Sequence, residues 1–283
     1  MDALLIQFAD LKLLFGAIVG LIIGVLAGVT GLPLGALRLP VVYSIVPTPH
    51  IAAGTNLGID TLTAVTASYW YWKGGFVNIS ILIFMGGSSC IGAFLGGYSS
   101  KFVSYKWLLI FIGLMYFCVG LDMLRGAVNE KVGTGPLNEG QPDREGPSVP
   151  TSQPDCMTRV KENSEVLAAL SGFVLGFVGG MAGLLMGSLR VPAMIKAMGL
   201  APVTAAGTNM VISLFTAISG FGGHIVHRNL DLSVFLTMGV ASMAGAYVGA
   251  KLGVTLSPST TKKLIGMAIV LMATALFING IRL

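Results

Sequence analysis

The chain has 283 residues, of which 54% are hydrophobic and only 10% are charged, and its mean hydropathy is +0.83. A soluble chain of this length needs a charged surface, so this composition excludes a soluble protein and predicts an integral membrane protein. The net charge of +5 comes from basic residues scattered singly among apolar runs, which argues against nucleic-acid binding and fits the cationic loops of a membrane protein.

The first part of the chain contains five apolar segments, which are predicted to be helices. Backbone groups must be paired inside a bilayer, and these long apolar runs lack the alternation of barrel strands. The segments cover residues 11–30, 33–47, 50–72, 76–98 and 105–126. The acidic N-terminus and the lack of a small-residue cleavage site predict that the first segment is retained, not removed as a signal peptide.

A polar stretch separates these segments from a second set of five. It is rich in charged residues and carries five prolines, so it cannot bury enough apolar area to fold alone. The second set covers residues 165–182, 185–199, 202–223, 230–252 and 260–280. The sequence therefore predicts a first transmembrane repeat over 1–127, a solvated linker over 128–164 and a second transmembrane repeat over 165–283.

The two sets are related in sequence, which indicates an internal duplication. Residues 24–40 and 176–192 are identical at eight of 17 positions, and residues 49–56 and 202–209 are identical at six of eight. Such a run of matches at a nearly constant offset is typical of transporters built from two repeats.

Two G-x-x-x-G pairs lie at equivalent positions of the repeats. They are Gly92–Gly96 in the first repeat and Gly245–Gly249 in the second. Small residues at this spacing allow two helices to approach closely in lipid, so these pairs are interpreted as packing sites.

The relative orientation of the repeats depends on how often each crosses the membrane. Five full crossings, or three crossings with a re-entrant pair, are odd numbers and give inverted repeats. If the first two segments of each repeat form one broken crossing, the number is four and the repeats are parallel. Inverted repeats are favoured, because transporters often combine them with broken helices.

Each repeat interrupts its first apolar run in the same way, and these breaks are the predicted substrate site. Residues 30–33 break the run of the first repeat, and residues 181–184 break that of the second. A helix that begins inside a membrane protein directs unpaired N–H groups and the positive end of its dipole at whatever lies there, which suits an anion. Gly35 and Gly187 would let the backbone approach such a ligand closely.

Polar side chains follow the breaks at equivalent positions. Arg38 and Arg190 lie inside apolar sequence, where each would either bind sulfonate, sulfite or carboxylate oxygens or snorkel to the interface. Asp60, whose equivalent is Ser213, either pairs with an arginine or carries a coupling proton. Neutral hydrogen-bonding groups for the substrate are supplied by Thr55, Asn56, Thr208 and Asn209.

These features resemble the TauE/SafE family of sulfite and organosulfonate exporters, also called the toluene-sulfonate-uptake permease group. The matching residues are Gly28, Gly31, Gly35, Pro40 and Ala53–Asn56, and in the second repeat Gly180, Gly183, Gly187, Pro192 and Ala206–Asn209. The family's glycine cluster is richer, and Arg38 and Arg190 stand where apolar residues are common. The resemblance implies export or import of small sulfur-containing anions across the prokaryotic inner membrane.

The resulting hypothesis is a secondary transporter, an exporter of sulfite, sulfoacetate or related organosulfonates that needs neither cofactor nor metal. An anion channel is the alternative, because broken helices suit both. An intramembrane enzyme is less favoured, because the sequence has neither a His/Asp/Glu cluster nor a Gly-x-Ser-x-Gly elbow. The expected partners are the anion, the lipid bilayer and a coupling proton, and a homodimer is left open.

Overall fold

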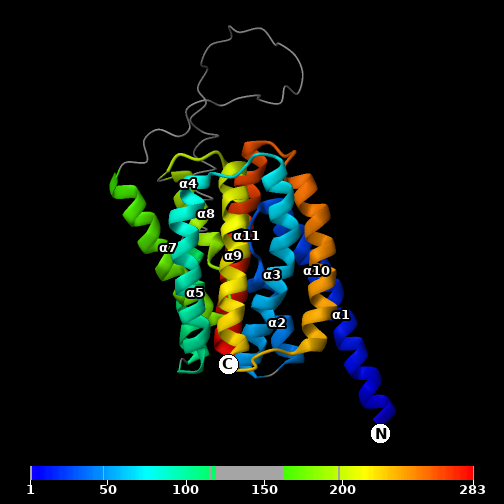
Figure 1. Cartoon of the computed structure of the whole chain (residues 1–283). Helices are drawn as coiled ribbons and strands as arrows, with labels where there is room; N and C mark the ends of the chain where they lie inside the picture. Colours follow the sequence, from blue (N-terminus) through cyan, green and yellow to red (C-terminus); the bar gives the residue numbers. More distant parts are fainter. Residues whose placement is uncertain are drawn as a thin grey trace.

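The computed structural model describes residues 2–46, 48–102, 104–114, 116–118, 162–196 and 198–282. Within these residues every regular element is a helix, which confirms the all-helical prediction. The helices stand side by side in one bundle (Figure 1). Most of the predicted linker lies outside the described residues.

The helices follow the predicted segments closely. The first part of the chain forms α1 (Asp2–Thr30), α2 (Gly35–Ile45), α3 (Pro49–Lys73), α4 (Ile79–Ile81), the π-helical turn η1 (Leu82–Gly86), α5 (Gly87–Ser99), the 3-10 turn η2 (Ser100–Phe102) and an apolar helix over Tyr105–Cys118. The second part forms α7 (Glu162–Ala182), α8 (Gly187–Lys196), α9 (Pro202–Ile225), α10 (Leu232–Gly253) and α11 (Pro258–Arg282).

Length, composition and surface make this a multi-pass membrane protein. Four stretches are long and apolar enough to cross a bilayer, namely Leu11–Thr30, Ile79–Phe102, Pro202–Ile225 and Leu232–Gly253. Large apolar side chains such as Phe15, Ile83 and Val240 are more than half exposed, which suits a surface covered by lipid.

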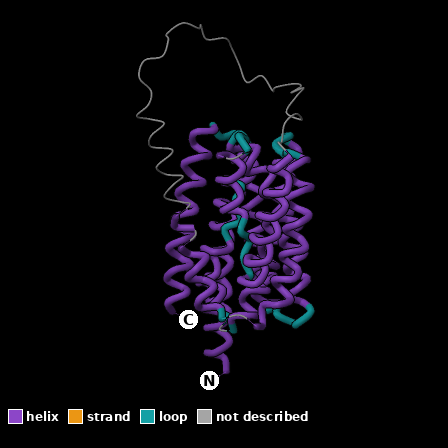
Figure 2. Tube along the Cα trace, turned by 90° about the vertical axis from the view of Figure 1, so that its left-hand side faces the viewer, coloured by secondary structure: helices purple, strands orange, loops and turns teal. Residues whose placement is uncertain are grey.

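Helix α1 ends at a glycine, as predicted. Gly31 has a φ of +65°, a left-handed conformation that glycine adopts without the penalty of a Cβ atom. The chain then runs without helix until Gly35, with Leu32 and Leu34 fully buried. Gly183, with a φ of +69°, directly follows α7 and begins the equivalent non-helical run before α8. Non-helical chain consequently lies inside the bundle, between its two ends (Figure 2).

The helices that follow the breaks are short. At 1.5 Å per residue, the 11 residues of α2 and the 10 of α8 span about half of a bilayer core. The arginine in the first turns of each helix, Arg38 in α2 and Arg190 in α8, therefore lies well inside the protein.

The two parts of the chain interlock instead of packing as separate bodies. Helix α1 packs most extensively on α10, and α7 packs most extensively on η1 and α5. A methyl group on Gly92 would overlap the carbonyl of Phe173 in α7, and one on Gly245 would overlap the carbonyl of Leu21 in α1. The second glycine of each G-x-x-x-G pair is packed in the same way. The predicted packing role of these pairs is confirmed.

This packing gives a test of the α5–α7 interface. Gly92→Ala should lower the free energy of unfolding by about 1–3 kcal/mol, because the methyl group overpacks a backbone contact. Gly87→Ala on the same helix is the matched control, because a methyl group there meets nothing within 4 Å. Thermal unfolding in detergent measures both, and equal unfolding temperatures for the two variants would contradict the described contact.

Candidate functional site

Two arginines lie in the interior of the bundle. Arg38 on α2 and Arg190 on α8 are each only 1% exposed, so the snorkelling alternative is wrong for both. A buried guanidinium in a membrane protein is expensive and generally serves function. The surroundings of these two side chains therefore define the candidate site.

Arg38 is held by the neighbouring helix α3. Its Nη2 donates to Asp60 Oδ1 at 2.7 Å and to the Asn56 carbonyl at 3.2 Å, and its Nε donates to Asn56 Oδ1 at 3.0 Å. Asp60 is 2% exposed, so this is a buried ion pair. The predicted pairing of Asp60 with an arginine is present, and a role in proton coupling stays a prediction.

Arg190 has only neutral partners among the described residues. Its Nη1 donates to Ser89 Oγ in α5 at 3.1 Å, and its Nη2 donates to Ser213 Oγ in α9 at 3.2 Å. Its Nε is buried without a hydrogen-bond partner. Across the described part of the chain, the Arg38–Asp60 contact is the single salt bridge within 4.0 Å. The charge of Arg190 is therefore not neutralised by a carboxylate there.

The two asparagines tie each break to the other half of the chain. Asn56 Nδ2 donates to the Gly183 carbonyl at 2.9 Å, and Asn209 Nδ2 donates to the Gly31 carbonyl at 3.0 Å. A buried carbonyl at a helix break needs a donor, and these amides supply one. Asn56 also accepts from Arg38, and Asn209 lies beside Gly187 at the start of α8, the helix that carries Arg190, so the structure joins the breaks to the helices of the charged residues.

The two threonines have a different position from the one expected. Thr55 Oγ1 accepts from the backbone N–H of Asp231 at 2.8 Å, and Thr208 Oγ1 accepts from that of Asn78 at 2.9 Å. Those residues cap the following helices through their own side chains. The hydroxyls thus fix the loops before α4 and α10, and the structure does not bring them to the arginines.

Gly35 and Gly187 adjoin the polar side chains, as predicted. A methyl group on Gly187 would lie 2.7 Å from Asn209 Oδ1 and 2.9 Å from Ser213 Oγ. One on Gly35 would lie 2.8 Å from Asn56 Nδ2 and would overlap the Asp60 carboxylate. Glycine at both positions therefore lets the helix start approach these groups closely.

Two further buried residues escaped the sequence analysis. Tyr71 Oη donates to the Gly28 carbonyl at 3.0 Å, and His224 Nε2 donates to the Gly180 carbonyl at 2.9 Å. They satisfy carbonyls at the C-terminal ends of α1 and α7, just before the breaks. His224 is fully buried in α9.

The Tyr71 contact can be tested by a single change. Tyr71→Phe should lower the free energy of unfolding by about 1–3 kcal/mol, because it leaves a buried carbonyl without a donor. Tyr69→Phe on the same helix is the control, since Tyr69 is 56% exposed and should shift stability by less than about 0.5 kcal/mol. Equal effects in thermal unfolding would contradict the capping role.

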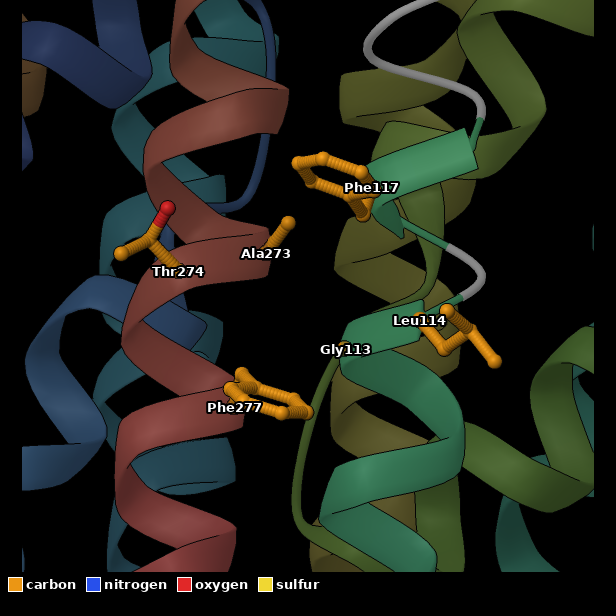
Figure 3. A pocket seen from close by; sticks show the side chains of 6 residues that line it. All are labelled: Gly113, Leu114, Phe117, Ala273, Thr274 and Phe277. Atoms are coloured by element: carbon orange, nitrogen blue, oxygen red, sulfur yellow. The ribbon is translucent and has the colours of Figure 1, made fainter.

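A separate groove lies between the Tyr105–Cys118 helix and α11. Figure 3 shows Phe117 and Phe277 directed toward the facing helix, and the lining is apolar except for Thr274. The Thr274 hydroxyl donates to the Val270 carbonyl at 3.1 Å. Leu114, Phe117 and Phe277 are about half exposed, so this groove belongs to the lipid-facing surface and is unsuited to an anion.

Comparison with known proteins identifies the family. Residues 16–276 match the family described as "Sulfite exporter TauE/SafE". The chain is 26% identical over 278 residues to "Probable membrane transporter protein YunE" of Bacillus subtilis (strain 168), covering 93% of this chain and 97% of that protein. It is 25% identical over 206 residues to "Probable membrane transporter protein YdhB" of the same organism, covering 71% and 74%.

A third relative in that organism, "Probable membrane transporter protein YjnA", is 21% identical over 273 residues, covering 94% of this chain and 97% of that protein. No solved structure matches the chain. All three relatives are named as transporters and none as an enzyme. With the match over nearly its whole length, the chain belongs to the sulfite exporter TauE/SafE family of membrane transporters.

Proposed function

We propose that this protein is a secondary transporter that exports small sulfur-containing anions, such as sulfite, sulfoacetate or related organosulfonates, across a prokaryotic inner membrane. The observation that carries the proposal is the pair of fully buried arginines, each on a half-length helix that begins at an equivalent break. Such a site offers an anion a guanidinium and a helix N-terminus together. The family's name supplies the sulfur chemistry.

The proposed architecture is a pair of inverted repeats, over 1–127 and 165–283, joined by a solvated linker over 128–164. Two observations support it. Helices α1 and α7 begin at opposite ends of the bundle (Figure 1). The contacts of the asparagines, the threonines and the glycine pairs recur in reciprocal form between the two parts of the chain.

The proposed substrate region lies where the two breaks meet their partner helices. It comprises Arg38, Arg190, Gly35, Gly187, Asn56 and Asn209, with Thr55 and Thr208 on the same helical turns. Its groups come from both halves, so a relative movement of the halves would change the access of the anion. Such a movement around a central site is how repeat-built transporters alternate their access.

A panel of anions tests the proposal. Sulfite present at about 100 times its Kd should stabilise the purified protein by about 2.7 kcal/mol, because a ligand that binds only the folded state raises its stability. For a protein of this size, that corresponds to a rise of roughly 5–10 °C in the unfolding temperature. Gluconate, a larger organic anion without sulfur, is the control. A shift no larger with sulfite or sulfoacetate than with gluconate would contradict sulfur-anion binding.

Asp60 is the proposed coupling residue. If it takes up a proton during transport, Asp60→Asn should leave anion flux in proteoliposomes while removing its dependence on a pH gradient. This change leaves Arg38 without a counter-ion. The same pH dependence is therefore also measured in the double variant Arg38→Met/Asp60→Asn, which lacks the buried charge. Unchanged dependence on the pH gradient in both variants would contradict coupling through Asp60 and leave the ion pair as its role.

A further inference from the structure

The two halves of the proposed site differ in how the arginine is neutralised. In the first half, Asp60 Oδ1 lies 2.7 Å from Arg38 Nη2, and the carboxylate adjoins Gly35 at the start of α2. A carboxylate that faces both a guanidinium and a helix N-terminus occupies the position of a bound anion. Asp60 is thus an internal substitute for an anion on the Arg38 side.

In the second half, the equivalent position carries Ser213. Its hydroxyl lies beside Gly187 at the start of α8 and accepts from Arg190 at 3.2 Å, but it brings no negative charge. The guanidinium there remains a fully buried cation with hydroxyl partners. An uncompensated buried charge is strongly destabilising, whereas a matched one is not.

A second difference concerns one hydrogen bond. Arg38 Nε donates to Asn56 Oδ1 at 3.0 Å. The equivalent donor and acceptor, Arg190 Nε and Asn209 Oδ1, are both buried and both without a partner. Arg190 is instead drawn toward Ser89 on α5. The second half therefore has a charged donor and a neutral acceptor without hydrogen-bond partners, whereas the equivalent donor and acceptor of the first half are bonded to each other.

These two open groups specify the chemistry of their ligand. An anion with acceptors alone satisfies the guanidinium but leaves Asn209 Oδ1 unpaired. A water molecule makes both hydrogen bonds but does not neutralise the positive charge of Arg190. The ligand must supply a negative charge, an acceptor for Arg190 and a donor for Asn209. An oxyanion that retains one O–H group supplies all three, because its charged oxygens accept from Arg190 and its hydroxyl donates to Asn209.

We propose that the anion binds to Arg190 in the second half, as a small oxyanion that carries one hydroxyl proton, and that Asp60 takes its place in the first half. This inference rests on the proposed function and assigns the binding residues within that site. Hydrogensulfite is such an ion. Methanesulfinate has the same sulfur centre and charge but a methyl group in place of the hydroxyl.

The first test compares these two anions by calorimetry in weakly acidic buffer, in which sulfite carries one proton. The wild-type protein should bind hydrogensulfite about ten-fold more tightly than methanesulfinate, the effect of one hydrogen bond. Arg190→Met should weaken hydrogensulfite binding about 10- to 100-fold, since a charge-assisted contact is lost. Lys251→Met is the control for net charge, because Lys251 is exposed, and it should bind like the wild type.

A second test installs the missing carboxylate. Ser213→Asp should raise the unfolding temperature in anion-free buffer by at least about 5 °C over the isosteric, neutral Ser213→Asn, and should lose stabilisation by hydrogensulfite. This test holds even if Arg190→Met fails to fold. Equal unfolding temperatures for the two variants, or hydrogensulfite binding to Ser213→Asp as in the wild type, would overturn the inference.

The outcomes separate the two proposals. If the wild-type protein binds no sulfur anion, the proposed function and the inference both fail. If it binds hydrogensulfite while Arg190→Met binds it equally well, or if only Arg38→Met/Asp60→Leu loses binding, the inference fails and the transporter function stands. Equal affinity of the wild type for hydrogensulfite and methanesulfinate would overturn the role of the hydroxyl proton.

Discussion

Asp60→Leu is expected to lower the free energy of unfolding by about 3–5 kcal/mol, because it leaves the guanidinium of Arg38 buried without a counter-ion. Arg38 is 1% exposed and its charged contact in the described structure is Asp60 Oδ1 at 2.7 Å. At this degree of burial, bulk water does not solvate the guanidinium in place of the carboxylate. Chemical or thermal unfolding of the purified protein in detergent measures the loss.

The double variant Arg38→Met/Asp60→Leu is the control for this prediction. It removes both charges and keeps apolar side chains of similar size, so it should recover most of the lost stability. Equal destabilisation of the single and double variants would show that shape, not charge, is responsible. A single variant within about 1 kcal/mol of the wild type would contradict a dry ion pair.

Alanine in place of the break glycines is the second change with a large expected effect. Gly31→Ala forces a Cβ onto a residue with a φ of +65° and into Ala206 of α9. Gly183→Ala does the same against Ala53 of α3. The left-handed conformation costs about 1–2 kcal/mol and overpacking about 1–3 kcal/mol more. Each variant should therefore lose about 2–5 kcal/mol of stability.

Gly75→Ala separates these two causes. Gly75 also has a positive φ, +73°, but an added methyl group meets nothing within 4 Å. It should show only the conformational cost. If Gly31→Ala and Gly75→Ala were equally stable in thermal unfolding, the break would not pack against α9 as described.

Much of the fold follows from the sequence, because its signals are local. The apolar runs predict the helices, and Gly31, Gly35 and Pro33 mark where the first run stops and restarts. The internal duplication supports these assignments, since Gly183 and Gly187 stand at the equivalent positions of the second repeat. The burial of the arginines is consistent with their position just after the breaks.

The partners within the site depend on contacts between distant helices, which a single sequence does not specify. Arg190 donates to Ser89, 101 residues away in the chain. Tyr71 and His224 perform the same capping at equivalent positions with different chemistry, so the comparison of repeats gave no signal for them.

The sequence also could not show which residues of the repeated motif lie near the arginines. Thr55 and Asn56 are neighbours in a Gly-Thr-Asn run that occurs in both halves, but adjacent residues on a helix face different ways. The hydroxyl contacts a loop, whereas the amide contacts the opposite break. The direction in which each side chain leaves the helix decides whether it packs against a loop or lies near the site. That direction can be assigned only when the positions of the neighbouring helices are known.

We propose that this chain carries small sulfur-containing anions through a site that depends on Arg190. Uptake of radiolabelled sulfite into proteoliposomes tests it most directly, with Arg190→Met and protein-free liposomes measured alongside. The wild-type protein should give a flux that saturates with sulfite concentration, and Arg190→Met should fall to the rate of the protein-free liposomes. A wild-type flux no greater than that of protein-free liposomes would contradict the transport of sulfite, and an Arg190→Met flux equal to the wild type would contradict the role of Arg190.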